Sequence, residues 1–184
     1  MYNTDYFYNM LRMYSSTAKT ICDIRWQFIA DAQASTVLDY GSGCGFFKAF
    51  APAHCIKCDT FDLMPVPQTG ITQDKYDIIC FWDVLEHCYD FFFLEELLAM
   101  TNWVAVTVPI KPDGIAWENY KHYKPLEHIH HFQKDSLCAL LHKFGFELFK
   151  EGTPECPPRE MIGSFLFKRI NTAGFGIENC DGTD

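Results

Sequence analysis

A glycine-rich turn at residues 39–45 is the clearest candidate for a ligand site in this sequence. It reads Asp-Tyr-Gly-Ser-Gly-Cys-Gly and lies between a short apolar run and a helix-compatible stretch at 46–50. Glycines let a backbone turn sharply and approach a ligand without an intervening Cβ, and a helix beginning beyond them offers N–H groups to an anion. A plain strand-to-helix turn needs fewer glycines than the three that alternate here. The turn residues expected to contact a ligand are Tyr40, Gly41, Ser42, Gly43 and Gly45.

Glycine spacing and two carboxylates narrow the choice of ligand. The dinucleotide fingerprint is G-x-G-x-x-G, whereas this turn is G-x-G-x-G with Asp39 two positions before the first glycine. Asp39 disfavours a pyrophosphate and suits an ammonium group. Asp59, at the end of the next predicted strand, can accept both hydroxyls of a ribose. A ligand with an amine, a carboxylate and a ribose but no diphosphate fits S-adenosylmethionine, which we expect as the cofactor.

Three segments, in order, resemble motifs of the class I S-adenosylmethionine-dependent methyltransferases, in the branch that acts on small molecules. The first is Val-Leu-Asp-Tyr-Gly-Ser-Gly-Cys-Gly at 37–45. The second, Tyr-Asp-Ile-Ile-Cys-Phe-Trp-Asp-Val-Leu-Glu-His at 76–87, is similar to the fourth-strand motif of that branch. The third is Glu-His-Ile-His-His-Phe at 127–132, followed by Ser136-Leu137 and Gly145-Phe146. Together they cover roughly residues 36–169.

This resemblance implies a role for several residues. The turn that begins at Asp39 would be the cofactor loop, and Asp59 would hold the ribose. Asp83, Val84 and Leu85 would line the wall beside the cofactor, and His87 would lie close to the reaction chamber.

The sequence also departs from the family pattern. Residues 60–74 contain Pro65, Pro67 and Gly70 and leave no room for the usual helix and third strand. We therefore expect the third strand to be reduced or absent, and no residue can be assigned to adenine. Gln133 occupies the place of the usual Ser or Thr helix cap, and the glycine turn before the fifth strand is missing.

Histidines gather in the second half of the chain. Five of the seven lie between residues 87 and 131. An oxygen or nitrogen acceptor can need a base, and histidine titrates near neutral pH, so His87, His122 and His128 are candidate catalytic residues. The alternative is that these histidines fix a loop through hydrogen bonds, and for His128 the two interpretations stay open. No metal site is expected, because no second Cys-x-x-Cys completes the pair at Cys55 and Cys58.

Apolar patterning around these motifs predicts alternating strands and helices. Strands are expected at 36–39, 55–58, 78–81 and 103–108, and helices at 17–34, 91–100 and 137–144. Two further strand-like runs, 146–150 and 164–169, predict an antiparallel pair. The expected architecture is α/β and Rossmann-like: a doubly wound, mostly parallel sheet with an antiparallel C-terminal hairpin.

One domain is expected over residues 1–170, followed by a flexible acidic tail at 171–184. The aromatic segment at 1–16 is either a lid over an apolar acceptor or packing on the sheet edge. The sequence does not separate these two interpretations.

Charge and composition exclude several partners. The 184 residues carry 24 acidic against 15 basic side chains, a net charge of −9, which disfavours nucleic acid. No apolar run approaches the roughly 20 residues of a membrane span, and the chain begins without a signal-peptide pattern. Nine scattered cysteines suit reduced thiols, so we expect a cytoplasmic protein.

The expected function is methyl transfer from S-adenosylmethionine to a small-molecule acceptor, with oxygen favoured. Amino-methylating nucleic-acid enzymes carry Asn/Asp-Pro-Pro-aromatic where Trp82-Asp83-Val84-Leu85 stands here. The rival from another class is an inactive cofactor-binding module that acts through a protein partner. The shortened segment after Asp59 keeps that rival open.

Overall fold

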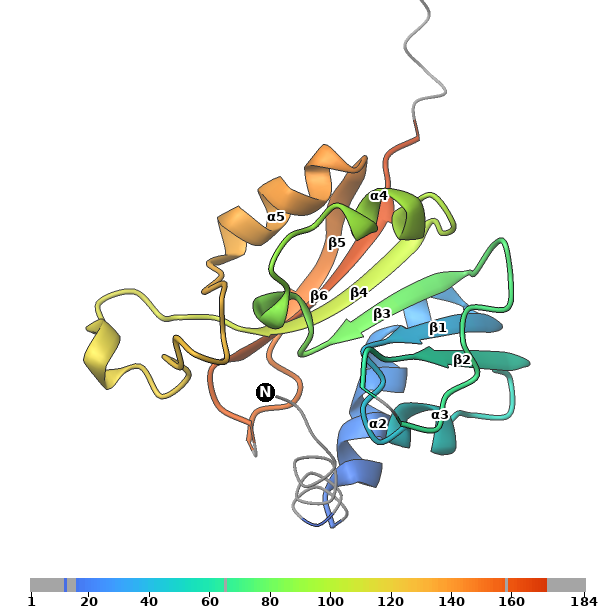
Figure 1. Cartoon of the computed structure of the whole chain (residues 1–184), viewed down its shortest axis with the longest axis horizontal. Helices are drawn as coiled ribbons and strands as arrows, with labels where there is room; N and C mark the ends of the chain where they lie inside the picture. Colours follow the sequence, from blue (N-terminus) through green and yellow to red (C-terminus); the bar gives the residue numbers. More distant parts are fainter. Residues whose placement is uncertain (1–11, 13–15, 65, 158, 172–184) are drawn as a thin grey trace, which may run out of the picture.

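Six strands form one mixed sheet at the centre of the molecule (Figure 1). The computed structural model describes residues 12, 16–64, 66–157 and 159–171. The strands lie in the spatial order β2-β1-β3-β4-β6-β5. Their bounds are β1 Thr36–Tyr40, β2 Lys57–Phe61, β3 Ile78–Trp82, β4 Trp103–Pro109, β5 Phe146–Gly152 and β6 Ile162–Arg169. The first four strands run parallel, and β6 is antiparallel to both β4 and β5.

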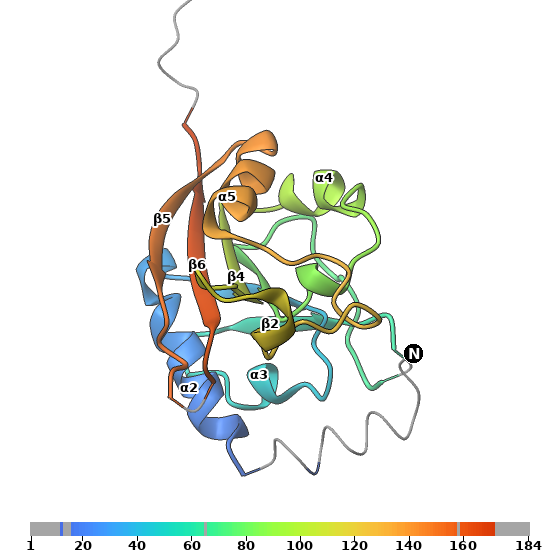
Figure 2. The same ribbon diagram turned by 90° about the vertical axis from the view of Figure 1, so that its left-hand side faces the viewer.

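Helices cover both faces of this sheet. On one face lie α2 (Ala18–Phe28) and α3 (Phe46–Ala49), and on the other α4 (Phe93–Leu98) and α5 (Lys134–Lys143) (Figure 1). Figure 2 shows α5 beside the hairpin of β5 and β6. The 3-10 turns are η1 (Ala30–Ala32), η2 (Leu85–His87) and η3 (Trp117–Asn119).

Side-chain alternation along β3 explains why the sheet is doubly covered. Ile78, Cys80 and Trp82 pack with the α2 side, whereas Ile79 and Phe81 pack with the α4 and α5 side. All five are buried, as expected of a central parallel strand with helices on both faces. The Rossmann-like architecture and the antiparallel C-terminal hairpin predicted from the sequence are thereby confirmed.

The order of the strands places the candidate site. Chain order reverses at β1, which has β2 on one side and β3 on the other. In doubly wound sheets a ligand binds outside the carboxyl ends of the strands at such a reversal. The turns that follow β1, β2 and β3 all lie at that edge.

The third strand of the family pattern is absent from the described part of residues 62–77, as expected. This segment folds back on the edge strand β2 instead. The amide of Gly70 donates to the carbonyl of Thr60 at 2.9 Å, and the amide of Thr60 donates to Thr69 Oγ1 at 2.7 Å. The segment thus covers an edge that would otherwise be open.

Several predicted bounds need correction. The second strand is Lys57–Phe61 and not 55–58, because its parallel pairing with β1 runs from Lys57 to Phe61. The first helix ends at Phe28, and η1 follows it. Gln133 does cap α5, with Ser136 Oγ accepting from its amide at 3.0 Å. The predicted segments 1–16 and 171–184 lie outside the described residues, apart from Arg12, Ser16 and Asn171. No described helix is long and apolar enough to span a membrane.

Candidate functional site

The glycine turn after β1 is held against two neighbouring segments. Its amides at Gly41 and Ser42 both donate to the carbonyl of Phe61, at 2.7 and 3.1 Å. Gly41, Gly43 and Gly45 all have positive φ, between 51° and 79°, a region that favours glycine. A Cβ on Gly41 would overlap Val84 Cγ2, so the turn packs directly on the chain that leaves β3.

Asp39 is a buried carboxylate beside this turn. Its side chain is 1% exposed, and no described group donates a hydrogen bond to its buried Oδ1. Burial raises the pKa of Asp39 to about 7, against the opposing effect of Arg25 and with a further increase from Asp62. A carboxylate desolvated in this way is stabilised by a cation placed against it.

The second predicted carboxylate, Asp59, is occupied by protein groups. Its Oδ2 accepts hydrogen bonds from Tyr76 OH at 2.6 Å and from Thr72 Oγ1 at 2.5 Å. Burial alone would raise the pKa of Asp59, but these two bonds hold it below its ordinary value. The side chain is 2% exposed. Asp59 therefore fastens the 62–77 segment to the sheet.

Asp62 stands directly after β2 and lies against the glycine turn. Its Oδ2 accepts the amide of Gly43 at 2.7 Å, and its Oδ1 accepts the amide of Met64 at 2.7 Å. Sequence reasoning did not select Asp62, because it placed the end of the strand before Asp59. With the strand ending at Phe61, Asp62 is the first residue of the turn at the edge where ligands bind.

The residues after β3 point in different directions. Val84 contacts the glycine turn, as the resemblance implies, but Leu85 is fully buried in the core. Asp83 has φ of 60° and turns toward two arginines. Arg159 contacts both of its oxygens at 2.8 and 2.9 Å, and Arg25 contacts one at 2.8 Å. Burial opposes ionisation, yet Arg159 and Arg25 lower the pKa of Asp83 to about 2.

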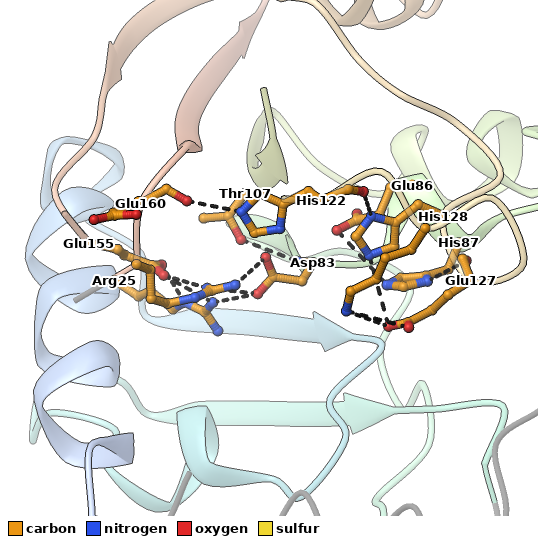
Figure 3. A network of polar contacts seen from close by, with 12 residues as sticks. Arg25, Asp83, Glu86, His87, Thr107, His122, Glu127, His128, Glu155 and Glu160 are labelled. Carbon is orange, nitrogen blue, oxygen red and sulfur yellow. Dashed lines mark hydrogen bonds and ion pairs between the residues drawn. The ribbon is translucent and has the colours of Figure 1, made fainter. Parts of the chain in front are cut away.

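Figure 3 shows the three candidate histidines near Asp83, with His87 and His128 on the side away from Arg25 and His122 between His128 and Glu160. The rings of His87 and His128 meet edge to face with centroids 4.9 Å apart, and His122 stacks on His128 at 6.4 Å. Each ring has a backbone carbonyl within hydrogen-bond distance: Glu127 for His87, His122 for His128 and Glu160 for His122. Burial, with His87 beside it, lowers the pKa of His128 to about 4, and burial also lowers that of His122.

Two further features bear on ligand binding. Tyr40 is half-buried and stacks on Phe61, with ring centroids 4.9 Å apart, so it supports the turn from the α4 side. Ser42 Oγ is buried and has no hydrogen-bond partner among the described residues. Glu86, between Leu85 and His87, is 2% exposed, and its Oε2 has no such partner either.

A doubly wound sheet, a glycine turn with an acidic residue before it and a second carboxylate at the next strand end define a class I methyltransferase fold. The model of a family described as a methyltransferase domain matches residues 14–151, and the chain belongs to that family. It is an S-adenosylmethionine-dependent methyltransferase, with S-adenosylmethionine as its cofactor.

Solved structures share the fold at low sequence identity. Magnesium protoporphyrin IX methyltransferase from Synechocystis PCC 6803, with bound S-adenosylhomocysteine, has a TM-score of 0.55 at 14% identity, covering 92% of this chain and 89% of that one. A Burkholderia thailandensis 1,6-didemethyltoxoflavin-N1-methyltransferase has 0.62 at 16%, covering 84% and 79%. Human N-acetylserotonin methyltransferase in complex with S-adenosylmethionine has 0.64 at 13%, covering 90% and 55%. Among proteins of curated function, none matches the sequence significantly.

Proposed function

We propose that this enzyme transfers the methyl group of S-adenosylmethionine to a small molecule, at an oxygen atom. The observation that carries the proposal is the buried Asp39 carboxylate, with no partner at Oδ1, beside a glycine turn that Asp62 closes from the neighbouring strand. The cofactor brings an ammonium group, a carboxylate and a ribose, and these groups match that edge of the sheet.

Each site residue then has a part in the proposal. Asp39 faces the ammonium group, and the backbone of the glycine turn lies along the methionine portion. Asp62 accepts the ribose hydroxyls with the lone pairs left beside its bonds to the Gly43 and Met64 amides, since it lies at the turn. Asp59 Oδ2 instead fastens Tyr76 and Thr72 to the sheet. Asp83 shapes the wall through its arginines and does not itself need to touch the cofactor.

The charge of the chain, the similar structures and the polar cluster beside the turn favour a small-molecule acceptor. The chain has a net charge of −9, which suits no polyanion. Two of the similar structures have small-molecule acceptors in their names, a porphyrin and a toxoflavin precursor. A hydroxyl acceptor must lose a proton, and the polar cluster of Glu86, His87, His122 and His128 lies just beyond Val84 to assist that step.

Calorimetry with S-adenosylhomocysteine tests the cofactor assignments, with NAD as a control ligand. Asp62→Asn is expected to weaken binding by about 1–3 kcal/mol, because a charge-assisted hydrogen bond to the ribose is lost. Asp59→Asn is expected to change affinity little, since its bonds are internal. If Asp59→Asn weakens binding and Asp62→Asn does not, the ribose contact belongs to Asp59, as the sequence predicts.

Release of S-adenosylhomocysteine during turnover tests the acceptor. A panel of paired hydroxyl and amino compounds of similar shape is incubated with the enzyme and S-adenosylmethionine. Turnover with the hydroxyl member of a pair is expected. Turnover confined to amino compounds contradicts oxygen transfer, and turnover confined to nucleic acid or protein contradicts a small-molecule acceptor.

A further inference from the structure

Three side chains that can ligate a metal converge beside the cofactor turn. They are Glu86 and His87 in η2 and His128 in the long segment that follows β4. One ligand atom from each lies within 4.8 Å of the other two. Within the described ranges, no other set of three His, Cys, Asp or Glu side chains comes together in this way.

Backbone hydrogen bonds hold the two segments in register. The carbonyl of Glu86 accepts the amides of Ile129 and His130, at 2.7 and 3.0 Å. The ring of His87 reaches back to the carbonyl of Glu127. These bonds hold His87 beside His128, although the two lie far apart in the chain. A metal site needs its ligands preorganised in this way.

The hydrogen bonds of both rings select the tautomer that binds metals. Nδ1 of His87 lies 2.9 Å from the carbonyl oxygen of Glu127, and Nδ1 of His128 lies 2.9 Å from that of His122. A carbonyl oxygen only accepts, so Nδ1 carries the proton in each ring. A neutral ring then has its lone pair on Nε2. Metal-ligating histidines commonly donate their other ring nitrogen to a carbonyl in this way.

Glu86 supplies an independent sign that a cation belongs here. It is 2% exposed, and its buried Oε2 has no hydrogen-bond partner among the described residues. Its Oε1 lies 3.9 Å from Nε2 of His87. The nearby arginines contact Asp83 and Glu155 instead. A buried carboxylate oxygen without a hydrogen-bond donor is costly, and a bound cation removes that cost.

We propose that Glu86, His87 and His128 bind one divalent transition-metal ion of the Zn²⁺ type, through a carboxylate oxygen and two Nε2 atoms. Two imidazoles and one carboxylate suit Zn²⁺ or Fe²⁺ better than Mg²⁺ or Ca²⁺, which prefer oxygen ligands. Bond lengths of about 2.0–2.2 Å bring ligand atoms to about 3–4 Å from one another. The side chains therefore close by roughly 1 Å around the ion. This departs from the sequence-based expectation of no metal.

Three protein ligands leave positions open for the acceptor, and this step rests on the proposed function. A hydroxyl bound to the ion loses its proton to solvent more readily, because the cation stabilises the oxyanion. The oxygen then forms a bond to the methyl carbon. The carbon–sulfur bond breaks with its electron pair going to sulfur, which leaves methylated acceptor and neutral S-adenosylhomocysteine. His87 and His128 act here as ligands, not as proton acceptors.

Zinc titration of the full chain by calorimetry tests the site. Wild-type protein is expected to bind Zn²⁺ at one tight site. Glu86→Gln, His87→Ala and His128→Ala should each weaken it by more than the roughly 10- to 100-fold that loss of a ring's hydrogen-bond partner costs at known sites. Glu96→Gln and His142→Ala are exposed controls that should change nothing. Circular dichroism checks that each variant folds, and Glu86→Gln preserves side-chain shape.

Two outcomes would overturn the site. One is zinc affinity that stays unchanged in all three variants, as binding to cysteine thiols would give. The other is a visible spectrum of the Co²⁺-loaded protein dominated by sulfur charge-transfer bands, which points to the same thiols. Tight Co²⁺ binding with nitrogen and oxygen ligand-field bands that are lost in His128→Ala supports it.

Chelation separates this proposal from the proposed function. After dialysis against dipicolinate, S-adenosylhomocysteine binding should persist, while methyl transfer falls at least about tenfold and returns with Zn²⁺. Unchanged turnover without metal overturns the catalytic part of the inference and leaves the methyltransferase assignment standing. A confirmed metal site with no hydroxyl acceptor methylated overturns oxygen transfer instead, while the zinc titration still supports the site.

Discussion

Under the proposed function, the Asp39 carboxylate is the residue whose ionisation should change most when the cofactor binds. Burial favours its neutral form and raises its pKa to about 7, although Arg25 opposes this effect. Because the pKa is raised on folding, Asp39 makes the unliganded protein less stable as pH rises from about 4 to 7. The cofactor ammonium is expected to reverse that trend by pairing with the ionised form.

Cofactor affinity is therefore expected to rise with pH through about 7. Below the pKa of Asp39 one proton must leave for the ammonium to bind, so affinity for S-adenosylhomocysteine changes by up to about tenfold per pH unit. Calorimetry from pH 5.5 to 8 measures the slope. Asp39→Asn should flatten it and weaken binding at pH 8, whereas the exposed control Asp74→Asn should leave it unchanged. A slope that survives in Asp39→Asn would contradict the assignment of this proton to Asp39.

Residue types and spacing were enough to find the loop and its first carboxylate, since Asp39 and the glycines lie in one continuous turn. They were not enough for Asp62 or Glu86. The proposed ribose acceptor depends on where β2 ends, and a three-residue error in the strand end moves the edge residue from Asp62 to Asp59. Glu86 meets His128 only through backbone bonds between distant segments, which no local pattern records.

At the scale of elements, the glycine turn and η2 form one packed unit. Gly41 has φ of 79°, and the position of its missing Cβ is taken by Val84. The amide of His87 in turn bonds the carbonyl of Val84 at 3.0 Å. Val84 thus connects the glycine turn with the histidine cluster. A displacement of one is therefore expected to displace the other.

Gly41→Ala is expected to destabilise the protein and weaken cofactor binding together. A left-handed backbone costs alanine about 1–2 kcal/mol, and the overlap with Val84 adds a packing cost. Gly114→Ala is the matched control, because Gly114 has φ of 77° with open space around it, so only the backbone cost applies. Urea unfolding and calorimetry measure both effects. Adding Val84→Ala should recover part of the Gly41→Ala loss, and a strictly additive double variant would contradict the contact.

The sequence pattern predicted the type of each element better than it predicted the residues where the element begins and ends. Buried strands such as β3 show continuous apolar runs. The helix α5 ends at Lys143, and Gly145 follows its cap with a φ of 80° that few other residues adopt. The 55–58 strand was misplaced because its cysteines looked like core residues, whereas the strand buries Asp59 and Thr60 against Thr72, Thr69 and Tyr76. Tertiary hydrogen bonds to the 62–77 segment, not hydropathy, set that boundary.

Across the whole molecule, one ion cluster ties three distant parts of the chain together. The cluster contains Arg25 from α2, Asp83 after β3, and Glu155 and Arg159 from the link between β5 and β6. Their ion pairs measure 2.5 to 2.8 Å. Glu155 is fully buried and pairs with both arginines. The cluster fastens the hairpin of β5 and β6 to the edge of the sheet where the candidate site lies (Figure 3).

Arg25→Met is accordingly expected to lower the free energy of unfolding by about 3–5 kcal/mol, because it leaves the buried Glu155 and the partly buried Asp83 with one arginine instead of two. Lys19→Ala, which breaks the exposed pair with Asp23, should cost less than about 1 kcal/mol. Urea unfolding of both variants measures these losses. Equal losses in free energy of unfolding would contradict a stabilising role for the buried ion cluster.

The same cluster sets an acid limit on stability. Since the pairing lowers the pKa of Asp83 from 3.8 to about 2, its contribution is present above pH 4 and disappears as pH falls toward 2. In Arg25→Met the pKa of Asp83 moves upward toward its unfolded value, so the stability lost between pH 4 and 2 should be smaller than in the wild type. Urea unfolding followed by circular dichroism at several pH values between 2 and 6 measures the loss in both proteins. If both proteins lose the same free energy of unfolding over this range, Asp83 ionisation does not hold the hairpin to the sheet, and the arginines act through packing alone.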